Sequence, residues 1–347
     1  MSKRVNVQKL RQVLTSLFAH HGLSASDADI VTDILLETEL CGISTHGLSM
    51  VPAHIKKLDA GYNRNAVWCI EHGTASFSVC DADNSIGMLS AYRCMNLAIE
   101  KARTSGLHMV FCHNCNTFSA AYYYANMAAE AGMIAIISSN APTQMAPYGG
   151  KEKLLGTNPM AISVPTDKEA PFIFDMATSA VAKSKINDAF HSGEAKIPFG
   201  WATDIEGNPT DDPAEAIRGL LLPMAGPKGY GLSMAVDLIS GLLSGASCSD
   251  KVGRFYSPDN RCMNVGQSFA VIDPRLVYGE SFYQAADDYV KTIRSSMSAT
   301  DCPVRIPGDR NRAKREEALK NGLLLSDRLI SDLNALIEKD LSAENLI

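Results

Sequence analysis

The sequence contains no uninterrupted apolar run of the roughly 18 to 20 residues that a membrane-spanning helix requires. Its first segment, MSKRVNVQKLRQ, also lacks the apolar stretch of a secretory signal peptide. We therefore expect a cytoplasmic protein that does not contact a membrane. Large blocks of one charge are missing as well, because 32 lysines and arginines are interspersed with 38 aspartates and glutamates. Without a basic patch, nucleic acid is not expected as a partner.

A disulfide pattern is also missing. Nine cysteines, an odd number, are scattered along the chain, and Cys112 and Cys115 alone have the C-x-x-C spacing. Reduced, mostly buried thiols are the better interpretation. His113 lies between the two cysteines, but no second ligand pair follows at zinc-finger spacing. We therefore predict no metal site.

The chain does have enough apolar sequence for a substantial core. A protein of 347 residues, 46% of them apolar, buries roughly 75% of the surface that its unfolded chain exposes. Apolar residues recur at helical spacing over residues 7–21, and Ser26 with Asp29 resembles a capping box that opens a second helix. Together with a third helical stretch, these segments predict an N-terminal helical layer over residues 1–75.

Strands and helices alternate in the middle of the chain. Strands are predicted over 76–80, 108–112 and 133–139, with helices between them over 88–103 and 118–131. This alternation is typical of β-α-β units, so we predict an α/β sheet flanked by helices and containing parallel strand pairs. The sheet would occupy residues 76–275 in two lobes, and a C-terminal helical segment over 276–347 would pack with the N-terminal layer. The irregular stretch 140–158 is long enough to suggest a function.

Two phosphate-binding signatures are missing: G-x-G-x-x-G after a first strand, and G-x-x-x-x-G-K-[ST]. An ordinary Rossmann or P-loop domain is therefore disfavoured. Instead, a glycine-rich turn over 226–231 contains Lys228 and leads into an apolar helix. Close backbone approach, free N–H groups at the helix end and the lysine charge together suit a phosphate or carboxylate. A glycine corner where the helix crosses a neighbour explains the same residues equally well.

Two titratable side chains occupy positions that suit chemistry. His46 lies in a polar break between helices, where an imidazole can exchange a proton with a substrate oxygen. A hydrogen-bonded structural histidine is the alternative. Asp175 ends an apolar strand, where α/β sheets present polar side chains to a ligand, or it caps a following helix predicted over 178–190.

Six short segments of the sequence, given below in chain order, together resemble the malate/L-lactate dehydrogenase family of the non-Rossmann type. That family includes ureidoglycolate dehydrogenase, sulfolactate dehydrogenase, diketogulonate reductase and the piperideine-2-carboxylate reductases. The resemblance extends over about residues 5 to 330. The phrases are ISTHG at 43–47, APTQMAPYGG at 141–150, LGTNP at 155–159, FDMATS at 174–179, GNPT with a later DP at 207–213, and GPKGYG at 226–231.

The resemblance implies a distinctive α/β fold with a non-Rossmann sheet that binds NAD or NADP, a homodimer, and a small-molecule substrate. It implies that His46 exchanges a proton with the substrate. The implied cofactor contacts are Asp175, Met176 and Ala177, then Lys228 and Gly229, then Gly308, Asp309 and Arg310, with Asn140 and Ala141 flanking the nicotinamide.

Two departures from the family pattern affect the substrate. Members usually carry a second histidine where this chain has Thr117, and an arginine four residues after the first histidine, where it has Met50. Proton transfer then depends on His46, on a water held by Thr117, or on His113. A methionine cannot replace the bidentate contact of an arginine with a carboxylate.

Three functions remain open. The first is hydride transfer between nicotinamide and a small 2-hydroxy or 2-oxo acid, with His46 handling the proton. The second is reduction of a cyclic imine, or of another substrate that is not anchored by a carboxylate. The third is a cofactor-binding family member that has lost turnover.

Overall fold

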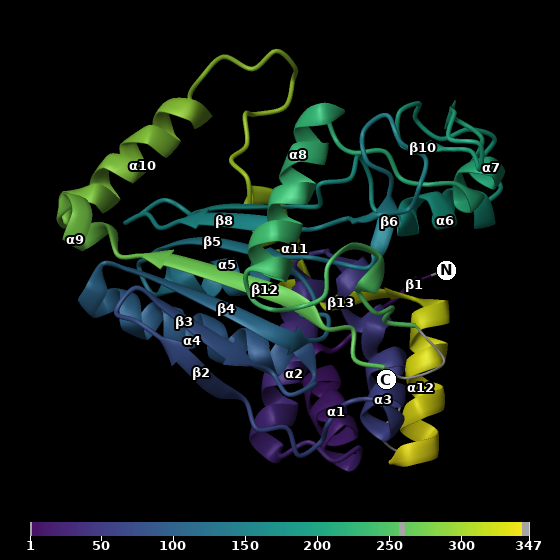
Figure 1. The fold of residues 1–347 in the computed structure, drawn as a ribbon, viewed down its shortest axis with the longest axis horizontal. Helices are drawn as coiled ribbons and strands as arrows, with labels where there is room; N and C mark the ends of the chain where they lie inside the picture. The colour runs from purple at the N-terminus through teal and green to yellow at the C-terminus, as the bar shows by residue number, and fades with distance from the viewer. Residues whose placement is uncertain (1, 257–260, 342–346) are drawn as a thin grey trace.

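A computed structural model describes residues 2–256, 261–341 and 347. Its centre is a seven-stranded sheet in the order β2-β3-β4-β12-β5-β8-β9 (Figure 1). The predicted β-α-β unit is present, because β3 and β4 pair in parallel. Their bounds are β2 Cys69–Gly73, β3 Phe77–Asp81, β4 Leu107–Cys115, β12 Val265–Ile272, β5 Ile134–Ser139, β8 Met160–Val164 and β9 Phe172–Met176.

The other pairs in this sheet are antiparallel, so the expectation of several parallel pairs is wrong. The reason is β12, which pairs antiparallel with both β4 and β5 and separates them. This strand is supplied from about 130 residues farther along the chain. Local alternation in the sequence does not show such an insertion.

Helices cover both faces of the sheet. α4 (Gly87–Ser105) and α5 (Ala121–Glu130) pack on one face, whereas α8 (Pro227–Val236) and the π-helical segment η3 (Asp237–Leu242) lie on the other (Figure 1). Three serines make this second contact close. The hydroxyls of Ser138, Ser240 and Ser268 bond one another at 2.7 to 2.8 Å where η3 meets β5 and β12.

The N-terminal helices form as predicted. They are α1 (Val7–His20), α2 (Ala25–Leu40) and α3 (Val51–Ala60), with the short turns η1 (Ser44–His46) and η2 (Leu48–Met50) before α3. The capping box is formed by Ser24 and Asp27 rather than by Ser26 and Asp29. Both pairs have the same spacing, and the earlier pair starts the helix sooner.

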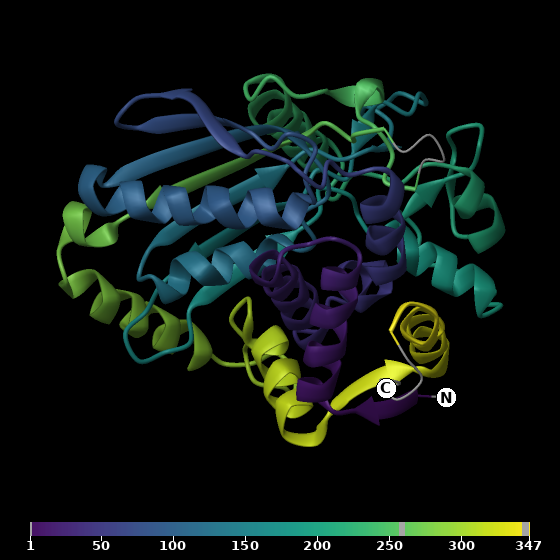
Figure 2. The same cartoon turned by 90° about the horizontal axis from the view of Figure 1, so that it is seen from below.

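The two ends of the chain lie together (Figure 2). β1 (Ser2–Val5) pairs antiparallel with β13 (Leu323–Ser326), and α12 (Asp327–Asp340) packs on α1 and α3. α11 (Asp309–Asn321) packs on α2. The remaining helices of this segment are α9 (Pro274–Tyr278) and α10 (Ser281–Arg294). The domain boundaries proposed from the sequence stay predictions.

A smaller lobe has its own buried core, which includes Met145, Ile186 and Leu221. The stretch 140–158 is not without structure, because β6 (Thr143–Met145) pairs with β7 (Leu155–Gly156) inside it. The lobe also contains α6 Lys183–His191, β10 Ala202–Thr203, β11 Pro209–Thr210, α7 Pro213–Arg218 and η4 Ser249–Lys251. No helix among the described residues is long and apolar enough to cross a membrane.

Candidate active site

The glycine-lysine segment lies inside a helix rather than ahead of one. α8 begins at Pro227, so Lys228 and Gly229 belong to its first turn. The N–H groups of Gly229 and Tyr230 already donate to the carbonyls of Met224 and Gly226. These two N–H groups are therefore not free to bind an anion, contrary to the prediction for this turn. Its attraction for an anion comes from the Lys228 charge and the positive end of the helix dipole.

The packing interpretation of the glycine-rich segment holds for Gly229, whereas anion binding by Lys228 stays a prediction. A Cβ on Gly229 would lie 2.2 Å from the Met224 carbonyl oxygen, so this glycine is required by packing. Lys228 is exposed, and among the described residues no carboxylate forms an ion pair with its ammonium group. It is thus available to a ligand.

Asp175, near the end of β9, caps no following helix. α6 starts only at Lys183, with Ala182 at its N-cap. Instead the Asp175 carboxylate accepts a hydrogen bond at 2.9 Å from the Tyr122 N–H, in the first turn of α5. Burial raises the pKa of Asp175 to about 6, against the effect of this hydrogen bond.

The helix predicted over 178–190 begins late because its first residues pair with another segment. The N–H of Ala180 donates to Leu222, and the N–H of Met224 donates to Thr178. These bonds join the end of β9, with Met176 and Ala177, to the loop that leads into α8. Residues far apart in the sequence are thereby held together at this point.

His46 ends the short turn η1. Its main-chain carbonyl accepts a 2.6 Å hydrogen bond from the Ser119 hydroxyl, which ties it to the segment before α5. The imidazole Nδ1 lies 2.9 Å from the Thr45 hydroxyl, and no hydrogen bond to Nε2 occurs within the described ranges. The side chain is exposed, yet the surrounding protein desolvates the ring and lowers its pKa below 6.5. A neutral imidazole with one free nitrogen is therefore available to a substrate.

Thr117 lies two residues before Ser119, in the same segment. Its side chain is partly buried, and its carbonyl packs against the start of α4, where a Cβ on Gly87 would lie 2.4 Å from the Thr117 oxygen. The structure therefore places Thr117 beside the start of α4, two residues from the Ser119 that bonds the His46 carbonyl. His113, the other proton carrier considered above, instead turns to β2 and bonds Glu71 at 2.9 Å.

Asn140 is buried, and both the nitrogen and the oxygen of its side-chain amide form hydrogen bonds within the protein. Its amide nitrogen donates to Asp237 at 3.0 Å and to the Ser247 carbonyl at 2.7 Å, and its oxygen accepts from the Gly266 N–H at 2.8 Å. These bonds fasten the end of β5 to η3 and to β12. A contact of Asn140 with a cofactor stays a prediction. In the structure its side chain links these segments.

Ala141 is held by a residue that the sequence analysis did not single out. Its N–H donates to the Asn158 side chain at 3.0 Å, and Asn158 donates to the Ser233 carbonyl in α8 at 2.8 Å. The position of Asn158 in the LGTNP segment was the feature of the sequence that could have identified it. Thr45, in the ISTHG phrase, was overlooked in the same way.

The segment containing Gly308, Asp309 and Arg310 lies beside β9, because the Ile173 N–H donates to the Pro307 carbonyl at 3.1 Å. The Asp309 carboxylate is committed to the protein, with both Arg294 and Arg312 at 2.7 Å. Arg310 is exposed and has no ion-pair partner in the part of the chain that the structure describes.

The side chain of Met50 has no polar contact with the part of the chain that the structure describes. It is 6% exposed and belongs to the main hydrophobic core. The side chain that replaces the family's arginine is therefore a packing residue.

A family model described as malate/L-lactate dehydrogenase matches residues 5–334. The chain belongs to the malate/L-lactate dehydrogenase family. The resemblance noted in the sequence is thus confirmed, and so are the non-Rossmann α/β fold and the expectation of an enzyme, since the matched relatives of this family are named dehydrogenases and reductases.

Three similar proteins illustrate the range of the malate/L-lactate dehydrogenase family. The malate/(S)-sulfolactate dehydrogenase of Methanothermus fervidus is 35% identical, covering 96% of this chain and 97% of that protein. The delta(1)-pyrroline-2-carboxylate/delta(1)-piperideine-2-carboxylate reductase of Pseudomonas putida is 30% identical, covering 96% and 97%. The solved sulfolactate dehydrogenase of Methanocaldococcus jannaschii superposes with a TM-score of 0.93 at 32% identity, covering 99% of both chains.

Proposed function

We propose that this chain is an NAD(P)-dependent oxidoreductase that transfers a hydride between nicotinamide and a small 2-hydroxy or 2-oxo acid. The observation that carries the proposal is the arrangement around His46. Ser119 holds the main chain of His46 near the start of α5, where Asp175 binds, and Thr45 contacts the neutral imidazole. Its free Nε2 suits proton exchange with a substrate hydroxyl.

The residues present fit a nicotinamide dinucleotide, which when bound supplies the hydride chemistry. Lys228 at the start of α8 and Arg310 beside β9 are exposed cations suited to phosphates. Asp175 has one carboxylate oxygen bonded to Tyr122, and its other oxygen can accept a hydroxyl. Cations and a hydroxyl acceptor are the donor and acceptor types that a dinucleotide requires.

The chain's own residues then move the proton. In the oxidative direction neutral His46 takes it from the substrate hydroxyl, and in the reductive direction the protonated ring returns it. Thr45 holds the ring through Nδ1. Thr117 does not titrate near neutral pH and serves only to hold a hydroxyl or a water.

A cyclic imine is the second candidate substrate. Met50 supports an imine or other substrate that is not anchored by a carboxylate, because a buried thioether gives a carboxylate no bidentate partner. The relative from Pseudomonas putida is named as a reductase of two cyclic imines, both of them carboxylates, so it supports the imine group and not the lack of a carboxylate anchor.

Direct assays of the purified full chain test these proposals. NADH and NADPH are titrated by fluorescence, and the absorbance of reduced nicotinamide is followed with 2-oxo acids and with cyclic imines that carry or lack a carboxylate. We expect saturable binding of at least one dinucleotide and turnover of a 2-oxo acid. Turnover of imines alone supports the second candidate, whereas binding without turnover on either class supports the loss of activity. The absence of dinucleotide binding at millimolar concentration overturns both enzymatic proposals.

We also propose that the chain forms a homodimer through α8 and η3. Leu238, Leu242 and Leu243 there are 52%, 64% and 61% exposed, next to the exposed Ile239. A continuous apolar face of this kind is typical of a protein interface. Sedimentation velocity measures the state directly, and a monomer at micromolar concentration contradicts the proposal.

A further inference from the structure

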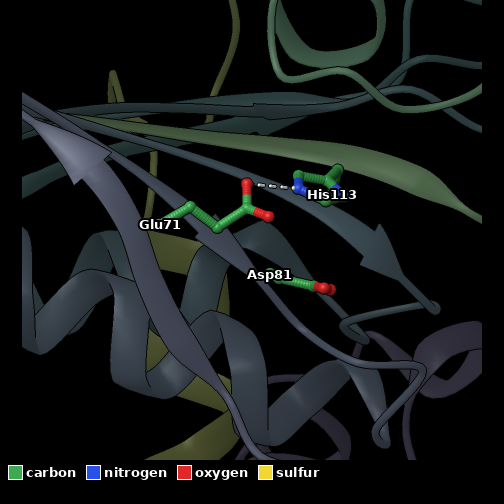
Figure 3. A group of neighbouring side chains, drawn as sticks. All are labelled: Glu71, Asp81 and His113. Atoms are coloured by element: carbon green, nitrogen blue, oxygen red, sulfur yellow. Dashed lines mark hydrogen bonds and ion pairs between the residues drawn. The ribbon is translucent and has the colours of Figure 1, made fainter.

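Three side chains on adjacent strands converge at the edge of the sheet (Figure 3). Glu71 comes from β2, Asp81 from β3 and His113 from β4. One ligand atom from each lies within 4.8 Å of the other two, and His113 Nε2 is 2.9 Å from a Glu71 oxygen. None of these residues belongs to the proposed active site.

The pairing of the strands explains why the three side chains meet. Asp81 and His113 are direct partners in the parallel pair of β3 and β4, so their side chains share one face. The pairing of β2 with β3 shifts between Ile70 and His72, which leaves Glu71 as the extra residue of a bulge. A bulge re-aims a side chain, and here it turns Glu71 toward His113 (Figure 3).

A neighbouring amide holds the Asp81 carboxylate in place. Its Oδ1 accepts from the Asn114 side chain at 2.9 Å and from the Asp83 N–H at 2.7 Å. The N–H of Asn114 in turn donates to Asn264 at 2.9 Å. Supporting bonds of this type orient the carboxylate ligands of metal ions. Both bonds involve Oδ1, so the Oδ2 atom of Asp81 is available to bind a metal ion.

This group contains two carboxylates and one imidazole. Among the described residues no lysine or arginine forms an ion pair with Glu71 or Asp81. A divalent cation would balance both carboxylates at once.

We propose that Glu71, Asp81 and His113 bind a divalent first-row transition metal ion. The ligands are His113 Nε2 and one oxygen from each carboxylate, with water completing the shell. An imidazole with two carboxylates favours ions such as Mn²⁺, Co²⁺ or Zn²⁺ over Mg²⁺ and Ca²⁺. The ion would link three neighbouring strands and so stabilise the exposed edge strand β2.

Manganese binding to the chelator-treated full chain tests this proposal. Electron paramagnetic resonance measures free Mn²⁺ during the titration, and Mn²⁺ prefers oxygen and nitrogen ligands to the nine thiols of the chain. We expect one saturable ion per chain. Glu71→Gln and His113→Gln should each weaken binding by at least tenfold, because each removes one of three protein ligands. His72→Gln is the matched control, since His72 is an exposed histidine next to Glu71 in β2 and should leave binding unchanged.

A second measurement separates loss of a ligand from loss of the fold. Mn²⁺ should raise the melting temperature of the wild type and of His72→Gln, and should leave Glu71→Gln unchanged. Melting temperatures without the ion show whether the variants fold. The proposal is overturned if no saturable binding occurs below millimolar Mn²⁺, or if Glu71→Gln binds as the wild type does. Strong thiolate charge-transfer bands with Co²⁺ would place the ion on cysteines instead and would equally overturn it.

Discussion

The first turns of α5 and α8 both present the positive end of a helix dipole, but the protein treats them differently. At α5 the turn is already occupied by an acid of this chain, because Asp175 accepts from the Tyr122 N–H. At α8 no side chain of the described residues caps the helix, and Lys228 adds a positive charge. The difference indicates a division of roles. The α5 end binds Asp175 and closely follows Ser119, which fixes the His46 main chain, whereas the lysine at the α8 end is available to attract an anion.

Replacing His46 should have the largest effect. It should change the catalytic rate and leave dinucleotide binding at the α8 end unchanged. His46→Gln removes the proton carrier, so kcat should fall by roughly 10² to 10⁴ while the Kd for the dinucleotide changes little. Steady-state kinetics and fluorescence titration measure the two quantities. Because the surrounding protein desolvates the His46 ring and lowers its pKa, the wild-type rate of hydroxy-acid oxidation should fall only below pH 6.5, where the ring becomes protonated.

His113→Gln is the matched histidine control for this experiment. His113 is bonded to Glu71 on β2, so its replacement should leave kcat unchanged. If kcat collapses in His113→Gln and survives in His46→Gln, the proton is carried by His113 and the role given to the α5 side is wrong.

Lys228→Met tests the other side of the comparison. Loss of one phosphate-binding charge should weaken the dinucleotide by roughly tenfold, about 1.4 kcal/mol, and leave kcat at saturating cofactor nearly unchanged. Fluorescence titration at two salt concentrations should show a smaller salt dependence than in the wild type. Lys251→Met, at an exposed lysine of η4, is the control. Equal affinity in Lys228→Met and the wild type would leave α8 without the proposed role.

The sequence predicts local structure well and long-range partners poorly. The helices and the strands near 76–80 and 108–112 were found because periodicity reports which face is buried. The position of β12 between β4 and β5 was not found, because strand neighbours are set by packing of distant segments.

The same limit applies to the candidate site. Phrases of the sequence contain His46, Asp175 and Lys228, but they do not show that Asp175 bonds to the start of α5, 53 residues earlier. Nor do they show that Glu71 meets His113, because that contact depends on a bulge and has no spacing signature.

The smallest expected effect concerns the stability of the α5 end. The pKa of Asp175 rises from 3.8 to about 6 on folding. The folded state therefore binds the proton more tightly than the unfolded state, so this group reduces stability as the pH rises from 3.8 to 6. Asp175→Asn keeps an oxygen for the Tyr122 N–H and carries no buried charge. It should raise the free energy of unfolding by about 1 kcal/mol at neutral pH, since the side chain is partly accessible and the full shift is not realised.

Urea denaturation at neutral pH and below pH 4 measures this difference, which should vanish in acid because both states of the wild-type carboxyl are then protonated. The same variant should weaken the dinucleotide if Asp175 accepts a ribose hydroxyl, so the stability gain would come with a loss of function. A less stable Asp175→Asn at neutral pH would instead mean that the carboxylate gains more from the α5 dipole than burial costs it. The α5 end would then resemble the α8 end in favouring an anion, and the two would differ only in which anion each one holds.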